Sequence, residues 1–274
     1  MEGLIIKIVS NDYTVLSNNK NYVCKARGKF RNLKITPLVG DKVLFDEKSK
    51  YIMDIKKRKN YLVRPPVANI DQAFIITSSK EPEFSSNLLD KLLVIIEFNN
   101  IKPIICFTKL DLLNQSELNL IENIINYYKK IGYEVYKNNE LDLIKQTFKN
   151  KITVFTGQSG AGKSTLLNKI DSTLNIKTDI ISHSLGRGKH TTRHVELLDI
   201  LNGLVADTPG FSAITFNGMT KTDLRDNFIE FNVYKDKCQY RDCMHRNEEN
   251  CNIKNNTEIL KSRYENYLKF IEEK

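Results

Sequence analysis

Eight consecutive residues near the middle of this 274-residue chain have the spacing of a phosphate-binding loop. They run Gly157-Gln158-Ser159-Gly160-Ala161-Gly162-Lys163-Ser164, match the pattern GxxxxGK[ST], and are followed by Thr165. Glycines let backbone amides point toward a phosphate, and a helix that begins here adds a favourable dipole. We expect the whole run to bind a nucleotide, with Lys163 acting catalytically on the β- and γ-phosphates and Ser164 holding Mg²⁺. The apolar run before the loop and the helical run after it favour this interpretation over a chance match.

A second motif has the composition of a nucleotide switch. Asp207-Thr208-Pro209-Gly210 follows the apolar run GLVA, where the second carboxylate of a phosphate-loop site is expected. Asp207 would hold Mg²⁺ through water, and the amide of Gly210 would face the γ-phosphate. By itself DTPG is also a good turn sequence.

The pattern [N/T]KxD, which reads guanine, occurs twice. A carboxylate can accept hydrogen bonds from guanine N1 and N2, and adenine has no matching pair of donors. Thr108-Lys109-Leu110-Asp111 follows an apolar run and precedes a helix, so it lies at the end of a strand, where α/β proteins bind ligands. Thr220-Lys221-Thr222-Asp223 has no strand before it, and we interpret Asp223 as an ordinary residue near a helix start. Thr108, Lys109 and Asp111 are therefore the predicted base site.

Two departures from the usual guanine site accompany this prediction. Position 108 is Thr rather than Asn, so one side-chain contact that supports the pocket is expected to be missing. The segment Lys137-Asn138-Asn139 lacks Ser-Ala, so the sequence does not identify the last base-contacting loop.

The segment 182–194, SHSLGRGKHTTRH, has no apolar periodicity and lies between the phosphate loop and DTPG. We expect Thr191 or Thr192 to complete Mg²⁺ coordination when the γ-phosphate is present. Phe211 follows DTPG, at the position where Ras-like enzymes carry a glutamine that positions water, and a phenyl ring can neither orient nor deprotonate water. His190 is the candidate for that catalytic role, with Thr191 beside it; an ordinary loop histidine is the alternative.

Four residues near the C-terminus form a set of metal ligands. Cys238, Cys243, His245 and Cys251 offer three thiolates and one imidazole within 14 residues. This is a closed tetrahedral Zn²⁺ set without an open position, so the predicted role is structural. The surrounding segment is rich in polar residues, and metal binding would supply the free energy that orders it.

The elements that must position these residues begin with a basic module. Residues 1–66 hold 15 Lys and Arg against 6 Asp and Glu, whereas residues 67–274 hold 27 of each, so the net charge of +9 belongs to the first segment. Five short strand-like runs in that segment predict a small barrel, either an oligonucleotide-binding (OB) or an SH3-like one. Such a basic barrel favours binding to a polyanion such as RNA, and a solvated basic surface is the alternative. The candidate RNA-binding residues are Lys25, Arg27, Lys29, Arg31 and Lys34.

The rest of the chain changes pattern twice. After Arg64-Pro65-Pro66, strand-like runs alternate with helical stretches at 86–99, 114–131 and 140–150, which predicts βαβ units and a parallel sheet. After Phe216 the strands stop, and a helix with an apolar stripe over 256–274 ends the chain. We therefore predict a multi-domain protein: a barrel at 1–66, an α/β phosphate-loop domain at 67–218, and an α-helical zinc-binding module at 219–274.

Composition excludes several classes of protein. At 41% hydrophobic residues the chain can fold, and it has no apolar run near the roughly 18 residues of a membrane span. The N-terminus lacks the pattern of a signal peptide, so we expect a cytoplasmic protein with no membrane partner. We also expect a monomer. Five cysteines do not suggest a disulfide framework, and Cys24 and Cys106 are predicted to be packed thiols.

The order of the motifs is the most specific feature. If Asp111 reads the base, the base motif precedes the phosphate loop, the reverse of ordinary GTPases. With VANIDQAFI, TKLDLL, GQSGAGKSTLLN, GRGKHTTRH, DTPGF and the Cys/His cluster in this order, the chain resembles the ribosome small-subunit-dependent GTPase A family (RsgA, also called YjeQ). The resemblance covers nearly the whole chain and implies a circularly permuted GTPase domain.

The resemblance also implies an activity and partners. The activity is hydrolysis of GTP to GDP with Mg²⁺, in a protein that also holds one structural Zn²⁺. The partners are the 30S ribosomal subunit and its 16S rRNA, and the role is in late subunit assembly, with turnover stimulated by the subunit and coupled to release. The resemblance also points to His190 as the catalytic histidine. Two alternatives are an RNA-binding assembly factor that uses GTP as a static clamp, and a permuted ATPase. The permutation leads us to expect that nucleotide state moves the C-terminal module.

Overall fold

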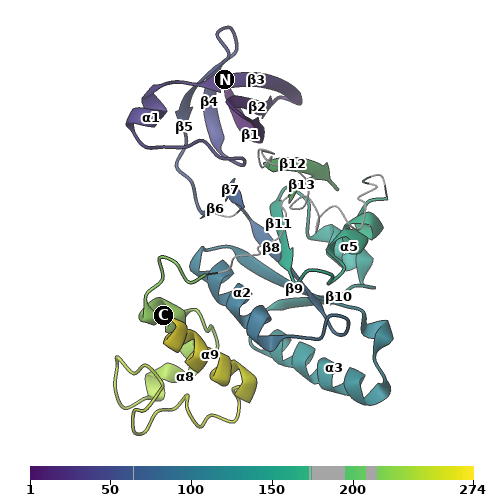
Figure 1. Ribbon diagram of the computed structural model, residues 1–274, viewed down its shortest axis with the longest axis vertical. Coiled ribbons are helices and arrows are strands. Elements are labelled where there is room, and N and C mark those ends of the chain that lie inside the picture. The colour runs from purple at the N-terminus through teal and green to yellow at the C-terminus, as the bar shows by residue number, and fades with distance from the viewer. Residues whose placement is uncertain (64, 173, 175–194, 208–214) are drawn as a thin grey trace, which may run out of the picture. The chain divides into compact units, whose positions relative to one another are not determined.

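The computed structural model in Figure 1 describes residues 1–63, 65–172, 174, 195–207 and 215–274. The chain forms two compact units. The first consists of Met1–Ala73, Glu140–Thr156 and Lys163–Ser212, and the second of Phe74–Asn139, Gly157–Gly162 and Ala213–Lys274. No helix within the described ranges is long and apolar enough to cross a membrane.

The first unit begins with a closed five-stranded barrel. Its strands are β1 (Glu2–Val9), β2 (Asp12–Ser17), β3 (Lys20–Ala26), β4 (Lys42–Asp46) and β5 (Tyr51–Ile55). They follow the order β1-β2-β3-β5-β4, and β4 pairs back onto β1. All neighbours are antiparallel except β3 and β5. This closure confirms the oligonucleotide-binding barrel rather than the SH3-like alternative.

Alternating side chains fill the barrel. In β2, Tyr13 and Val15 are buried while their neighbours Asp12 and Thr14 are partly exposed, as expected for a strand with one face on a core. The turn between β2 and β3 consists of Asn18 and Asn19, both with positive φ. Asparagine tolerates that conformation, and two such residues make a turn that matches the twist of the flanking strands. The short helix α1 (Lys29–Asn32) interrupts the chain after β3 and was not expected from the sequence.

Most of the basic run 56–59 (KKRK) is engaged in ion pairs within this unit. Lys56 pairs with Glu2 and Lys59 with Asp71. Arg58 Nε and Nη2 donate to the two carboxylate oxygens of Asp41 at 2.7 and 2.8 Å, and Asp41 is fully buried. These cations stabilise the barrel and the segment that leaves it.

The remaining strands of the first unit continue the sheet of the barrel or form a separate hairpin. A two-stranded antiparallel hairpin is formed by β6 (Tyr61–Val63) and β7 (Pro66–Ala68). Strand β11 (Ile152–Gly157) runs parallel to β13 (Gly203–Asp207), which pairs antiparallel with β12 (Val195–Ile200). β12 in turn pairs with β1 of the barrel, where Lys7 lies opposite Glu196 and forms an ion pair with it at 2.8 Å. Two helices, α4 (Leu141–Gln146) and α5 (Lys163–Ile170), contact each other.

The second unit contains the other α/β elements. The strand order is β10 (Glu134–Lys137), β9 (Lys102–Thr108), β8 (Gln72–Ser78), and β10 is parallel to β9. Every residue of β8 is buried, as expected for a strand covered on both faces. Helix α2 (Ser86–Phe98) packs against β9, and α3 (Gln115–Lys130) against β10. Ser85 caps α2, and Asn114 with Glu117 forms a capping box at the start of α3.

Short helices replace strands in the C-terminal part of this unit. They are α7 (Lys221–Asp226), α8 (Phe231–Tyr234), the 3₁₀ turn η2 (Lys235–Lys237) and the longer α9 (Lys261–Glu273). The helix expected over 256–274 begins only at Lys261, and its apolar stripe is confirmed as core, because Tyr267 and Ile271 are buried, as is Ile259 just before the helix. They share a hydrophobic cluster with Phe228, Phe231 and Phe270, and with Val94 and Ile95 of α2.

A buried polar network lies beside that cluster and was not foreseen. The guanidinium of Arg263 on α9 is fully buried, and it donates to Asp90 at 2.7 Å and to both carboxylate oxygens of Glu230 at 2.5 and 2.8 Å. Tyr128 of α3 and Asn266 of α9 donate to the Asp90 carboxylate as well. The network therefore joins α2, α3, α9 and the turn before α8.

Removing the central cation of this network should destabilise the second unit strongly. Arg263→Met leaves two buried carboxylates without their cation, and losing one partner of a buried ion pair costs about 3–5 kcal/mol. We expect a loss of that size in urea unfolding followed by circular dichroism. Lys261→Met, at an exposed position of the same helix, should stay within about 0.5 kcal/mol. Equal stability of the two variants would contradict this role for Arg263.

Candidate nucleotide and metal sites

The backbone of the phosphate loop has the conformation that its glycines allow. Gly157 ends β11 with φ 129°, and a Cβ there would lie 2.0 Å from the carbonyl oxygen of Ile76, so only glycine fits. Gly160 and Gly162 also have positive φ. Helix α5 begins directly after the loop, at Lys163, so the predicted succession of strand, loop and helix is present.

A hydrogen bond connects the predicted base motif to this loop. The hydroxyl of Thr108, at the end of β9, donates to the carbonyl oxygen of Ala161 at 2.7 Å, and both residues are buried. The sequence led us to expect that a supporting contact would be missing at position 108. Instead the threonine hydroxyl is long enough to hold the base motif against the phosphate loop.

The neighbouring residues of the motif are fixed by local backbone geometry. Lys109 has φ 59° and caps the 3₁₀ turn η1 (Leu110–Leu112), and its ammonium donates to the carbonyl oxygen of Glu81. Asp111 in this turn is exposed, so its carboxylate is accessible to a ligand. The loop around Glu81 follows β8, and its contact with Lys109 could not be predicted from the sequence, because every residue has a backbone carbonyl oxygen.

The second TKxD motif has a different, structural role. Thr220 caps α7: its hydroxyl accepts from the amide of Asp223 at 3.0 Å, and the Asp223 carboxylate accepts from the amide of Thr220 at 2.7 Å. This reciprocal arrangement is a capping box. The interpretation of Asp223 as a residue near a helix start is confirmed, which leaves Asp111 as the candidate base reader.

The remaining predicted nucleotide contacts are described in part. Lys163 and Ser164 are buried at the start of α5, and Thr165 is exposed. Burial lowers the pKa of Lys163, because desolvation disfavours its charged form. The backbone of Asp207 ends β13 opposite Glu196. His190, Thr191, Thr192 and Gly210 lie outside the described residues.

The four predicted metal ligands come together in the second unit. Nδ1 of His245 lies 3.7 Å from the sulfur of Cys238 and 3.4 Å from that of Cys251, and all four ligand atoms, with Cys243, lie within 4.8 Å of one another. Zinc bond lengths of about 2.3 Å to sulfur and 2.0–2.1 Å to nitrogen place ligands about 3.5–3.8 Å apart in a tetrahedron. The cluster therefore has nearly the dimensions of a zinc site.

The electrostatics of the cluster also fit a metal. Burial raises the pKa of the Cys243 thiol to about 12, so a thiolate at neutral pH needs a neighbouring cation. Burial lowers the pKa of His245 to about 4, so its imidazole is neutral and has a lone pair for a ligand bond. Around the sulfurs, the amides of Asn252 and Lys254 donate to Cys238 and Cys251 at 3.4 Å. Three thiols and a neutral imidazole so arranged could hold one Zn²⁺.

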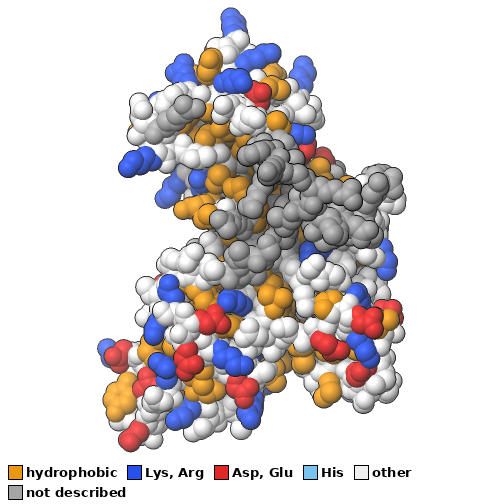
Figure 2. Space-filling model, viewed as in Figure 1, with side chains coloured by type: hydrophobic (Ala, Val, Ile, Leu, Met, Phe, Trp, Pro, Cys, Tyr) orange, Lys and Arg blue, Asp and Glu red, His pale blue; other side chains and the backbone are white. Residues whose placement is uncertain are grey.

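The barrel carries the candidate polyanion-binding side chains on its surface. Figure 2 shows Lys and Arg side chains gathered over the barrel, with few Asp or Glu side chains among them on this face. Lys25, Arg27, Lys29 and Lys34 are exposed, although Lys25 also pairs with Asp12 at 2.5 Å. They are interleaved with exposed apolar side chains of Val23, Leu33 and Ile35. Cations beside apolar surface suit the phosphates and bases of a nucleic acid.

Comparison with known proteins gives matches along the whole chain. The sequence profile of the family described as RsgA GTPase matches residues 55–217, and that of the RsgA N-terminal domain matches residues 2–51. A protein of Oceanobacillus iheyensis named small ribosomal subunit biogenesis GTPase RsgA 2 is 52% identical, over 99% of this chain and 97% of its own. A protein of Enterococcus faecalis named small ribosomal subunit biogenesis GTPase RsgA is 48% identical, over 100% of this chain and 95% of its own.

Solved structures agree with these matches. The crystal structure of YloQ, titled a circularly permuted GTPase, aligns with a TM-score of 0.84 at 41% identity, over 99% of this chain and 94% of the other. YjeQ from Thermotoga maritima aligns with a TM-score of 0.85 at 33% identity, over 99% and 97%. The predicted fold class, with a barrel, a permuted α/β domain and a Cys/His module, is confirmed.

The base site makes a testable prediction about nucleotide choice. Asp111→Asn replaces an acceptor that matches guanine N1 and N2, and each hydrogen bond to a charged group is worth about 1.5–3 kcal/mol. We expect binding of GDP to weaken at least about tenfold and binding of xanthosine diphosphate to strengthen, both measured by titration calorimetry. Asp223→Asn is the matched control from the capping box and should leave this preference unchanged. An unchanged preference in Asp111→Asn would indicate that another residue reads the base.

The Cys/His cluster makes a prediction about metal content. Elemental analysis of the purified protein should find one zinc per chain, and Cys251→Ser should lose it. Because the metal would order residues 238–254, chelation should also abolish the amide protection of that segment in hydrogen exchange. Cys24→Ala, which removes a buried thiol of the barrel, should keep the zinc. Protection that survives complete removal of zinc would show that packing alone orders the segment.

Proposed function

The chain belongs to the RsgA family of GTPases, and we propose that it hydrolyses GTP while assisting the biogenesis of the small ribosomal subunit. The hydrogen bond from Thr108 to Ala161 carries the local part of this proposal. This bond joins the predicted guanine-reading motif to the phosphate loop, although 53 residues separate the two in sequence, and it supports a single nucleotide site that uses both. The relatives named for small-subunit biogenesis match over nearly their full length, which supports the same target for this chain.

We infer the following roles in the nucleotide site. The amides from Gly157 to Gly162 surround the phosphates, and Lys163 neutralises charge that develops on the β- and γ-phosphates. Ser164, Asp207 and a threonine at 191 or 192 would hold Mg²⁺, which when bound would neutralise further charge on the phosphate oxygens. The stem of Lys109 covers the base while its ammonium remains on the Glu81 carbonyl, and Asp111 accepts from guanine. Because Lys163 is already desolvated, its charge acts on the phosphates with little screening.

The attacking water needs a polar group that the switch sequence does not supply. The residue after DTPG is Phe211, and its phenyl ring cannot orient water. We propose that His190 fills this role, and that it does so once the small subunit has positioned the segment that carries it. Turnover by the isolated protein should then be slow.

The flanking parts of the chain provide the contacts to the ribosomal subunit. The exposed cations of the barrel suit rRNA phosphates, and the zinc-ordered module offers a second, charge-balanced surface, with 11 charges of each sign in residues 219–274. We propose that the protein acts as a monomer in the cytoplasm, where it binds the 30S subunit through 16S rRNA. Hydrolysis of GTP would then be coupled to release.

The proposal is tested by multiple-turnover GTP hydrolysis with and without purified small ribosomal subunits. We expect strong stimulation, and we expect His190→Ala to lower the stimulated rate about 100-fold or more while nucleotide affinity is retained. Binding to the subunit without stimulation would support the alternative of a static GTP clamp. Undiminished stimulated turnover in His190→Ala would exclude that residue as the group that positions water.

A further inference from the structure

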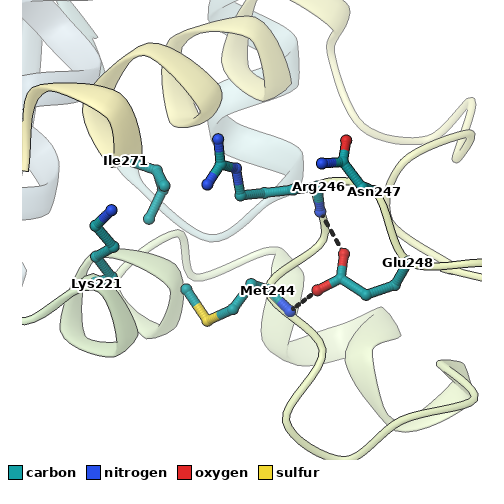
Figure 3. A pocket seen from close by; sticks show the side chains of 6 residues that line it. All are labelled: Lys221, Met244, Arg246, Asn247, Glu248 and Ile271. Atoms are coloured by element: carbon teal, nitrogen blue, oxygen red, sulfur yellow. Dashed lines mark hydrogen bonds between the residues drawn. The ribbon is translucent and has the colours of Figure 1, made fainter.

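A pocket of about 490 Å³ lies in the C-terminal part of the second unit, apart from the nucleotide-binding motifs. Figure 3 shows its lining, which comes from three places: Lys221 on α7, Ile271 on α9, and the loop of Met244, Arg246, Asn247 and Glu248. The volume falls within the range of about 300–1,000 Å³ of pockets that hold small ligands. Neither the nucleotide site nor the zinc ligands use these side chains.

The loop that forms one wall of the pocket is held rigidly. The Glu248 carboxylate accepts from the amides of Met244 and Arg246, each at 2.7 Å. The carbonyl oxygens of Met244 and His245 accept from the hydroxyls of Tyr267 and Tyr264 on α9, at 2.5 and 2.8 Å. With its amides and carbonyls fixed in this way, the loop presents the side chains of Arg246 and Asn247 in a preorganised position.

The lining combines three kinds of chemistry. Lys221 is exposed and Arg246 half-buried, and the two cations line the pocket from different elements, as Figure 3 shows. The guanidinium of Arg246 also lies 3.9 Å from a carboxylate oxygen of the exposed Glu272, and such an exposed ion pair is weak enough to give way to a phosphate. Met244 is half-buried and Ile271 is buried, so these two lining side chains make part of the wall apolar. The exposed amide of Asn247 can both donate and accept. The Glu248 carboxylate adds little repulsion to an anion, because it is occupied by two backbone amides.

We propose that this pocket receives one nucleotide of single-stranded RNA, with its phosphate between Lys221 and Arg246 and its base against Met244. A thioether packs favourably on an aromatic ring, and a guanidinium and an ammonium suit a phosphate. Asn247 faces the edge of the base. A carboxylate side chain from a protein would satisfy the cations but leave the apolar wall and the amide without a partner. Taking RNA as the macromolecule rests on the proposed action on the small ribosomal subunit.

The pocket also gives a use to a motif that the nucleotide site leaves aside. Thr220-Lys221-Thr222-Asp223 forms the capping box of α7, and that box fixes the first turn of the helix. Lys221 stands in this turn and is therefore held at the pocket's edge. The capping residues position the lysine, and the lysine contacts the phosphate.

The test is photo-crosslinking of the zinc-loaded, GDP-bound, full-length protein to a hexauridylate RNA that carries 4-thiouridine. Mass spectrometry of the digested complex should find a cross-link in the peptide that contains Met244–Glu248. The double variant Lys221→Glu, Arg246→Glu should lower the yield of that cross-link about tenfold or more. A variant that lacks only one of the two cations should lower the slope of log affinity against log salt concentration by about one. Lys269→Glu, an exposed position of α9 outside the pocket, is the matched control and should leave the yield unchanged.

Several outcomes would overturn the proposal. Cross-links confined to residues 1–66, or an equal yield in the double variant with its zinc retained, would exclude RNA from the pocket. Displacement by hexaglutamate as effective as that by unlabelled hexauridylate would show a site for acidic protein segments instead. The proposed function is judged separately: loss of small-subunit stimulation with the cross-link intact counts against that function and not against the pocket.

Discussion

The second unit depends on the pairing of one buried positive charge. A guanidinium removed from water is tolerated only when anions and hydrogen-bond acceptors surround it, and Arg263 finds them on two elements, Asp90 of α2 and Glu230 before α8. Its ring contacts, at 4.8 Å over Phe228 and 5.4 Å over Tyr128, add to this enclosure. Because both carboxylates must meet the same guanidinium, their pairing fixes the position of α9 along α2 and the start of α8.

That pairing decides how the C-terminal module can move. Val94 and Ile95 of α2 belong to the same hydrophobic cluster as the residues around the Cys/His site, and Asn266 donates to Asp90 from the next turn of α9. A motion of the module relative to α2 would expose these groups and break the ion pairs. We therefore expect the C-terminal module and α2 to move as one body. The motion of the module with nucleotide state that the permutation leads us to expect would then include α2. A signal from the nucleotide would have to reach α2 or the segment before Phe216.

The sequence predicts those features whose signal is local. Strand alternation in residues 1–55, the glycines of the phosphate loop and the spacing of the Cys/His ligands each reflect neighbours in sequence, and the structure has all three. Arg263 and Asn266 could not be foreseen, because a charged residue in a helix is ordinarily solvated and its burial here depends on Asp90, which lies 173 residues away from Arg263. The same holds for Thr108, whose partner Ala161 becomes visible only when the fold brings a strand end to the phosphate loop.

The distribution of charge illustrates the difference between composition and structure. The sequence assigns the whole excess of +9 to residues 1–66, which alone suggests a uniformly basic barrel. In the structure Lys56, Arg58 and Lys59 pair with carboxylates, and Arg58 serves to neutralise the buried Asp41. Among the cations that face solvent, Arg27, Lys29 and Lys34 lie in or next to α1 in the sequence, near exposed Leu33 and Ile35. Since a surface needs both charge and apolar area to hold phosphate and base together, the segment around α1 is where the barrel is best suited to RNA, and the run 56–59 is better understood as part of its framework.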